Sequence, residues 1–510
     1  MQARFTACFL TGLLMSSPGV ADVTTPRFEL RPIAEHIYTG GWEHFVGGGL
    51  AAFDCNGDDL PELYAAGGTN PAQLFINTSQ DTLSFEAETP DSLALTGVIG
   101  AYPLDIDNDA ILDLVVLRVG ENMALHGQGN CAFAPFKAIG FNGGNRWTTA
   151  FSATWEDGQT LPTLAFGNYV DRADPDGPFE ACDSNELWRP YGDVYGNPAL
   201  LEPGFCALSL LFSDWGRQGR ADLRVSNDRH YFVRGGEEQL WAMESQPRLF
   251  TRDDGWNSHQ LWGMGIASRD LDGDGLSEVY LTSMGDQRLQ ALDDGSEAPS
   301  YVDAPFASGT TAHRPYTGDD GRPSTGWHAA FGDVQNDGYA DLFIAKGNVE
   351  QMPGSAMDDP NNLLLGTPAG VVFEEAGLDA GIASMEKSRG AVLTDLNLDG
   401  LEDLAVVNRG SPLELYQNVS EPHGNWLQID LQQARANRFA VGAHVEVRSG
   451  RRTWTQEMTV GGGHAGGVSN ALHFGLATAL DAELRVIWPD GTIGDWHTVA
   501  TNQRVRVSRP

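Results

Sequence analysis

The chain has few lysines and, beyond its N-terminus, no long apolar segment. Of 32 basic residues only three are lysine (Lys137, Lys346 and Lys387), and acidic residues outnumber basic ones 69 to 32. A net charge of −37 argues against nucleic acid and anionic membrane surfaces as partners. No stretch approaches the roughly 20 consecutive apolar residues that a membrane-spanning helix needs. The composition therefore predicts no nucleic-acid partner and no membrane span.

The sequence also lacks the short motifs of the common enzyme classes. It contains no GxSxG nucleophile elbow, no HExxH zinc motif and no glycine-rich phosphate-binding loop. No CxxC pair is present, which argues against thiol redox chemistry and against a structural zinc site. We therefore favour a non-catalytic chain and assign no catalytic residue.

The first 21 residues have the pattern of a secretory signal peptide. Arg4 supplies the positive start, residues 5–15 form the apolar centre, and residues 19–21 are small enough for cleavage. The apolar centre is too short to span a bilayer. We expect a secreted or periplasmic mature chain that starts at Asp22.

Export would place the four remaining cysteines in an oxidising compartment, where an even number permits disulfides. Cys182 and Cys206 flank a polar insertion rich in proline and glycine, so we predict that they pair. A bond between Cys55 and Cys131 is the weaker prediction, because Cys55 lies inside an acidic loop.

A nine-residue acidic motif is the main feature that the chain does have. The copy at 270–278 has oxygen-bearing side chains at positions 1, 3, 5 and 9, and a glycine at position 6 that allows a sharp turn. Two carboxylates about 4 Å apart repel by on the order of 4 kcal/mol at an effective dielectric constant near 20. A bound cation removes that repulsion, and an all-oxygen ligand set suits Ca²⁺ before Mg²⁺.

The motif differs from an EF-hand. An EF-hand loop has a bidentate Glu at position 12 and lies between two helices. Position 12 here is Leu281, within an apolar run at 279–281 that favours a β-strand. The motif therefore joins two strands. The alternative interpretation is an acidic hairpin turn that binds no metal.

Four more copies begin at residues 54, 105, 333 and 395, and each runs into an apolar strand. Five copies together predict about five structural Ca²⁺ sites. The predicted metal ligands are Asp54, Asn56, Asp58 and Glu62; Asp105, Asp107, Asp109 and Asp113; Asp270, Asp272, Asp274 and Glu278; Asp333, Gln335, Asp337 and Asp341; and Asp395, Asn397, Asp399 and Asp403.

Two degraded copies, at 152–158 and 214–222, fill the gap between the second and third intact copies. Both keep the glycine turn and lose most carboxylates, so we predict turns that bind no metal. The result is seven units, each with a pattern of four short strands, which is typical of propeller blades. We predict an all-β fold, with a seven-bladed β-propeller over residues 22–422.

Ring closure gives a further prediction. The last unit ends at its third strand near Gln417, whereas residues 28–31 precede the first loop and have no blade of their own. We predict that residues 28–31 supply the outer strand of the seventh blade and join the two ends of the ring.

From residue 423 the acidic motif stops and alternating segments follow, which predict a separate small β-sandwich-like domain over 423–510. Within it, His464 lies in a glycine run. A flexible turn is the simpler interpretation there, and an anion or metal site is the alternative. Five tryptophans near blade strands favour packing between blades over a sugar-binding face; they are Trp147, Trp155, Trp256, Trp262 and Trp327.

The acidic repeats resemble the FG-GAP/VCBS repeats of integrin α-like propellers, and residues 331–333 and 166–168 keep the FG element. The C-terminal region resembles the ASPIC/UnbV domain at residues 441–443, 461–464, 473–476 and 488–491. Together the two halves are similar to the cartilage acidic protein family.

This resemblance implies a secreted calcium-binding protein that acts in adhesion or recognition. Its partner would be a protein or glycan ligand in the extracellular or periplasmic space. The alternative is a propeller enzyme, a lyase or hydrolase, that acts on polysaccharide.

Overall fold

The computed structural model describes residues 24–174, 181–228, 235–293, 295, 297–311, 321–469 and 471–510. The predicted signal peptide, residues 1–21, lies outside the described residues. Strands dominate, and the only α-helix among the described residues is the four-residue α1 (Gly377–Ala380). None of the described helices is long and apolar enough to cross a membrane.

Most strands before residue 419 pair into antiparallel sets of four. The sets are, in chain order, β2 (Leu50–Phe53), β3 (Glu62–Ala65), β4 (Gln73–Asn77) and β5 (Phe85–Ala87); β6 (Val98–Leu104), β7 (Asp113–Gly120), β8 (Met123–Gly127) and β9 (Phe133–Pro135); β10 (Arg146–Thr154), β11 (Thr163–Asn168), β12 (Asn185–Trp188) and β15 (Ala199–Leu201); β16 (Ala207–Ser213), β17 (Asp222–Asn227), β18 (Gln239–Ala242) and β19 (Arg248–Leu249); β20 (Gly263–Arg269), β21 (Glu278–Ser283), β22 (Arg288–Leu292) and β23 (Tyr301–Asp303); β24 (Gly326–Gly332), β25 (Asp341–Lys346), β26 (Asn362–Thr367) and β27 (Gly370–Glu375); and β28 (Ser388–Thr394), β29 (Asp403–Asn408) and β30 (Glu414–Asn418) with β1 (Phe28–Arg31).

The first strands of these sets form a ring. Neighbours contact each other in the order β2, β6, β10, β16, β20, β24 and β28, and β28 contacts β2 again. β6 and β28 are buried along their whole lengths. Accordingly β6 is an apolar run without a polar alternation, whereas β28 also buries the polar side chains of Ser388, Arg389 and Thr394. The predicted all-β propeller fold is confirmed.

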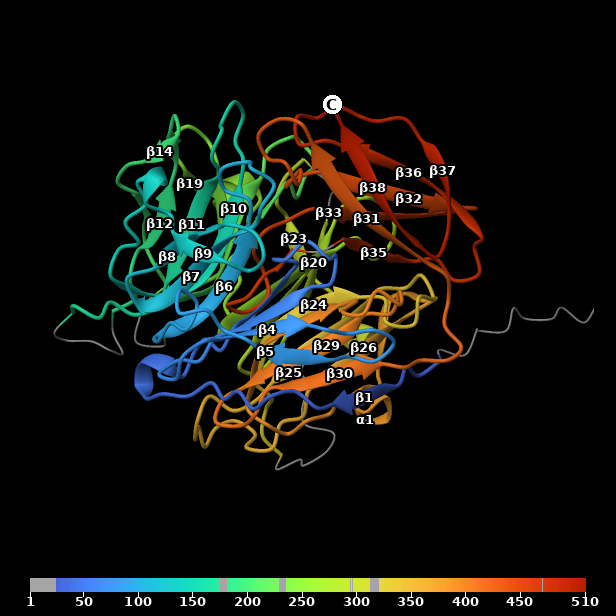
Figure 1. Ribbon diagram of the computed structural model, residues 1–510, viewed down its shortest axis with the longest axis horizontal. Helices are drawn as coiled ribbons and strands as arrows, with labels where there is room; N and C mark the ends of the chain where they lie inside the picture. The colour runs from blue at the N-terminus through green and yellow to red at the C-terminus, as the bar shows by residue number, and fades with distance from the viewer. Residues whose placement is uncertain are drawn as a thin grey trace, which may run out of the picture.

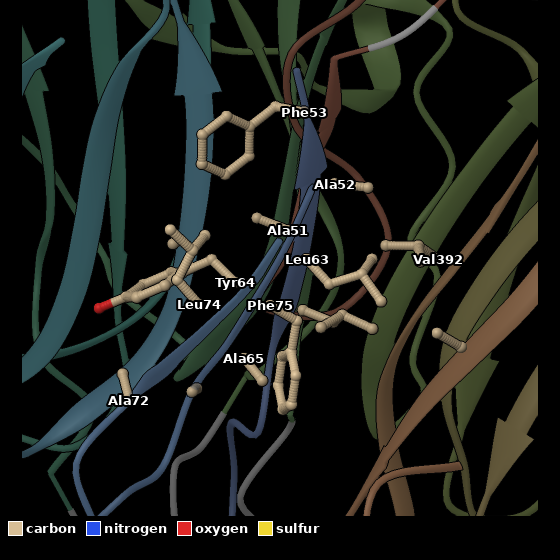
Figure 2. Close-up of a cluster of buried hydrophobic side chains, with 14 of the residues drawn as sticks. Ala51, Ala52, Phe53, Leu63, Tyr64, Ala65, Ala72, Leu74, Phe75 and Val392 are labelled. Atoms are coloured by element: carbon tan, nitrogen blue, oxygen red, sulfur yellow. The ribbon is translucent and has the colours of Figure 1, made fainter. Parts of the chain in front are cut away.

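The core between the first and last sets closes the ring. Leu63, Phe75 and Val392 belong to one buried cluster that spans β3, β4 and β28, and Figure 2 shows these side chains together between the two sheets. Burying one Leu or Phe side chain contributes about 1.5–3 kcal/mol relative to leaving it exposed. This apolar contact stabilises the ring at the position where its ends meet.

β1 is the outer strand that the sequence predicts for the last set. It pairs antiparallel with β30, from Phe28 opposite Asn418 to Arg31 opposite Leu415, and Figure 1 shows β1 beside β30 at the edge of the molecule. The predicted closure of the ring by residues 28–31 is therefore confirmed.

Deleting residues 22–35 is expected to lower the melting temperature by on the order of 10 °C. The deletion removes β1 and the buried Phe28, and losing a buried Phe side chain alone costs about 3–5 kcal/mol. Differential scanning calorimetry measures the shift. Leu30→Ala is the matched control, because Leu30 is 61% exposed and its loss is nearly neutral. An unchanged melting temperature after the deletion would contradict closure by β1.

Two disulfides cross-link the chain. Cys182 bonds to Cys206 across the insertion that also holds the hairpin β13 (Pro190–Tyr191) and β14 (Val194–Tyr195). Cys55 bonds to Cys131, which joins the first acidic loop to the end of the second set. The presence of Cys55 in an acidic loop does not prevent pairing, because its side chain and that of Cys131 lie in the same buried cluster.

The C-terminal strands form two sheets around a core of their own. Figure 1 shows them in red against one side of the ring. In the strand order of the sheets, they are β35 (Leu472–Gly475), β31 (Trp426–Gln433) and β38 (Gln503–Arg509); and β33 (Arg452–Glu457), β32 (His444–Ser449), β36 (Asp481–Ile487) and β37 (His497–Ala500).

The C-terminal sandwich, which the sequence predicts as a separate domain over residues 423–510, has a core of its own and also contacts the ring. Its strand β34 (Val468–Ser469) pairs in parallel with β2 of the first set. The glycine-rich segment before β34 runs among the first strands of the sets. β33 accordingly ends at Glu457, where the chain leaves the sandwich.

Candidate metal centres

Each of the five acidic loops joins the first and second strands of its set. In every loop the Oδ2 of the Asp at position 1 accepts a hydrogen bond from the backbone N–H of position 6, at 2.7–3.1 Å. Position 6 has a φ between 70° and 88°. Glycine tolerates this region best, and in two loops Asp59 and Ala110 adopt it instead. The turn is therefore the same with and without the glycine.

Position 9 is the first residue of the second strand. In all five loops one of its carboxylate oxygens accepts the N–H of position 2, at 2.7–3.0 Å. In three loops the other oxygen accepts an N–H from the third strand, as Asp403 does from Asn418 at 2.8 Å. The position-9 side chains are all at most 5% exposed. The backbone thus fixes the first and last predicted ligands.

The structure brings the predicted ligands together. Single carboxylate oxygens of Asp105, Asp107 and Asp113 lie within 4.8 Å of one another, and the same holds for the third loop with Asp270, Asp272 and Glu278. These two acidic clusters could hold a metal ion. In the other three loops position 3 is an amide, and its NH₂ group donates to the Asp at position 5 at 2.9–3.3 Å.

Two of these amides leave an oxygen without a partner. Gln335 Oε1 and Asn397 Oδ1 are buried and accept no hydrogen bond within the described protein, while their side chains are 3% and 9% exposed. A buried acceptor without a donor costs about 1–3 kcal/mol. A cation in each loop would satisfy that oxygen, so the residues present fit a bound metal.

Burial and crowding raise the pKa values of the loop carboxyls. Loss of hydration is the largest cause, and repulsion from neighbouring carboxylates adds to it. The pKa of Asp113 and that of Glu278 rise to about 8, that of Glu62 rises to about 7, and those of Asp105 and Asp270 rise to about 6. Without a cation, several of these groups would hold protons near neutral pH.

The two degraded loops use arginine where the intact loops have only oxygen ligands. In the third set Arg189 Nε lies 2.7 Å from Glu156 Oε1. In the fourth set Arg220 Nε lies 2.9 Å from Asp222 Oδ1. A guanidinium thus neutralises one of the two remaining acids in each degraded loop.

Sequence reasoning missed one side chain beside the second loop. His126 on β8 places Nε2 3.3 Å from Asp107 Oδ2 and 3.5 Å from Asp109 Oδ2. No motif spacing signals this contact, because β8 reaches the loop only through strand pairing. Cys55, Glu62 and Cys131 also cluster, but the two cysteines form the disulfide and offer no thiolate.

The tryptophans mainly pack inside the propeller. Trp147, Trp256 and Trp327 are at most 4% exposed, whereas Trp155 and Trp262 are partly exposed. Interblade packing therefore describes them better than a sugar-binding face. His464 is 0% exposed and hydrogen-bonded on both ring nitrogens. The expected flexible turn is wrong at this position, because the surrounding ring holds the segment in place.

A polar hollow of about 740 Å³ lies at the opposite strand ends from the acidic loops. It is lined by Glu43, Arg146, Asp171, Arg172 and Glu186, among others. Arg146 pairs with Asp183 and with Glu186, and Arg172 pairs with Glu43 at 2.6 Å. The hollow therefore offers both donors and acceptors.

Comparisons with protein-family models match both halves of the chain. Residues 54–116 match an FG-GAP-like repeat, and residues 433–510 match the ASPIC and UnbV family. These matches confirm the predicted combination of acidic propeller repeats and a C-terminal ASPIC/UnbV domain. No curated protein matches the chain.

Several solved structures are similar at low sequence identity. BBS1N, in complex with ARL6DN, is 9% identical, with a TM-score of 0.44 over 76% of this chain and 96% of that one. An Agrocybe aegerita lectin that recognises terminal N-acetylglucosamine is 13% identical, with a TM-score of 0.31 over 75% and 82%. Trypanosoma rangeli sialidase is 9% identical, with a TM-score of 0.34 over 74% and 59%.

Proposed function

We propose that this chain is an exported calcium-binding β-propeller that recognises a protein or glycan ligand without catalysis. The partnerless buried oxygens of Gln335 and Asn397 carry the calcium assignment. All-oxygen loops of carboxylates and amides suit a hard divalent cation, and Ca²⁺ accepts the irregular geometry that a strand-to-strand loop provides. The two disulfides fit an oxidising compartment.

Calcium has a structural role in this proposal. Each loop connects two strands of a buried sheet, so a cation there neutralises crowded carboxylates and fixes the turn. The arginines of the degraded loops support this role, because they supply positive charge where the ligand set is incomplete.

The polar hollow at the other end of the ring is the recognition site in this proposal. Hydroxyl-rich ligands such as glycans use both donors and acceptors, and the paired arginines and carboxylates of the hollow offer both. The pairing also weakens the enzymatic alternative, because each of these arginines is already neutralised by an acid.

The calcium assignment is tested by elemental analysis of the purified chain. We expect several Ca²⁺ ions per chain, and about one fewer in Asp403→Asn. Asp222→Asn is the matched control, because the same position in a degraded loop pairs with Arg220. Equal calcium content in the two variants would contradict the loop assignment.

Recognition is tested with a glycan array and an activity screen on acidic polysaccharides. We expect binding to a defined ligand class that weakens at least tenfold in Arg172→Ala, with no product released. Release of products with unsaturated ends would overturn the binding proposal in favour of a lyase.

A further inference from the structure

A segment of the C-terminal sandwich fills the centre of the ring. We call residues 460–467 the plug. Its backbone hydrogen-bonds to first strands of five sets: Ala153 N–H donates to Val460 O at 3.2 Å, Gly462 N–H to Leu210 O at 2.7 Å, Gly463 N–H to Ile266 O at 2.6 Å, Gly467 N–H to Ala101 O at 3.2 Å, and Ala52 N–H to Gly467 O at 3.1 Å.

His464 lies at the middle of the plug. Gly47 N–H donates to its Nε2 at 3.2 Å, so its Nδ1–H donates to Met264 O at 3.2 Å. Its own backbone N–H donates to His328 Nδ1 at 3.0 Å. Burial lowers the pKa of His464 to about 3 and that of His328 to about 4. Both imidazoles are therefore neutral, and hydrogen bonds between uncharged groups hold the plug in place.

The sandwich that carries the plug lies on the acidic loops. Gln428 Nε2 on β31 donates to Asp395 Oδ2 at 2.7 Å, and that same oxygen accepts Gly400 N–H at 2.8 Å. Asp395 is the position-1 ligand of the last intact loop. The sandwich therefore bonds directly to a predicted calcium ligand.

The neighbouring loop, at residues 333–341, also contacts the sandwich. Trp454 Nε1 donates to Gly338 O at 2.8 Å, and His473 Nε2 lies 2.6 Å from Asn336 Oδ1. Gly475 packs so closely on Asp333 that a methyl group there would lie 1.9 Å from Asp333 Oδ2. These contacts depend on the turn geometry at positions 1, 4 and 6 of the loop.

Charge alone does not account for this docking. Residues 423–510 contain nine arginines and seven acidic residues, whereas the whole chain has a net charge of −37. The contacts with the two loops nevertheless go mainly to backbone carbonyls, amide oxygens and one carboxylate. A loop whose carboxylates repel each other would lose the shape that these contacts need.

We propose that calcium binding and docking of the C-terminal sandwich are coupled. Ca²⁺ in the loops at 333–341 and 395–403 fixes the surface on which the sandwich lies, and the docked sandwich holds the plug in the ring. The chain thus contains a calcium-dependent closure of its own central channel. This inference rests on the calcium assignment of the proposed function.

Coupling is reciprocal, so docking must strengthen calcium binding by the factor by which calcium strengthens docking. A change that undocks the sandwich therefore weakens calcium binding by up to that factor. Trp454→Phe keeps an aromatic side chain and removes the indole N–H that donates to Gly338 O. Trp496→Phe is the matched control, because Trp496 stacks on Arg448 and Arg485 within the sandwich. We expect a fivefold or greater loss of affinity at one site in the first variant only, measured by isothermal titration calorimetry on the full chain.

Hydrogen exchange of the full chain measures directly how well the backbone amides of the plug are protected from solvent. We expect amides of residues 462–467 to exchange at least tenfold faster in EGTA than in Ca²⁺, at constant pH. A chain that binds no calcium would overturn the proposed function, and the coupling with it. A chain that binds calcium, yet shows equal plug exchange or equal affinities in both tryptophan variants, would overturn the coupling alone.

Discussion

Treating the purified chain with EGTA is expected to lower its melting temperature by more than about 10 °C. One site adds about 4 kcal/mol when free Ca²⁺ exceeds its dissociation constant a thousandfold. Each kcal/mol corresponds to about 2–4 °C in a domain of 150–250 residues. Loss of two or three sites therefore exceeds 10 °C even if the larger size of this chain reduces the shift.

Calorimetry before and after EGTA measures this shift, and excess Ca²⁺ should restore the original melting temperature. Asp222→Asn serves as the control, because Asp222 in its degraded loop pairs with Arg220, and its response to EGTA should match that of the unchanged chain. An EGTA-treated chain that keeps its melting temperature and carries no calcium by elemental analysis would exclude structural calcium.

Gly100→Ala is expected to destabilise the chain by about 3 kcal/mol or more. Gly100 lies in β6 with backbone angles open to any residue, but a methyl group there would lie 1.7 Å from Ala465 O of the plug. The obstacle is backbone, which cannot rotate away as a side chain can. Overpacking of this kind costs about 1–3 kcal/mol in ordinary cores and more where the neighbour is rigid.

Urea unfolding measures this loss as a lower midpoint at an unchanged slope. Gly196→Ala is the matched control, because Gly196 has no atom within 4 Å of a new methyl group and no left-handed backbone. We expect its stability to stay within about 0.5 kcal/mol of the unchanged chain. Equal midpoints for the two variants would show that the plug does not occupy the ring in solution.

The acidic loops and the ring were predictable because their signals are local and repeated. Each loop places its ligands within nine residues and runs into an apolar strand, and both features are visible in the sequence. Phe28–Arg31 could be assigned as an outer strand because the last unit was one strand short. In these cases a short segment, or a count of units, carries the information.

The plug, His126 and the environment of Cys55 were not predictable in the same way. The glycines at 461–463 look like a flexible turn in isolation, and only the surrounding strands require their small size. His126 meets Asp107 through strand pairing, without any spacing in the sequence. Contacts between different sets depend on how the ring closes. No single segment of the sequence contains the information that determines this closure.

The position of the plug after the last propeller set has a consequence for biogenesis. The last four-stranded set joins residues 28–31 to residues 414–418, so the circle cannot be completed until most of the chain has been made. The plug follows some forty residues later, and it must either thread into an assembled circle or wait for the circle to assemble around it. Contacts this distant in sequence are slow to form, so a nascent chain remains incompletely assembled until residues 460–467 have been made.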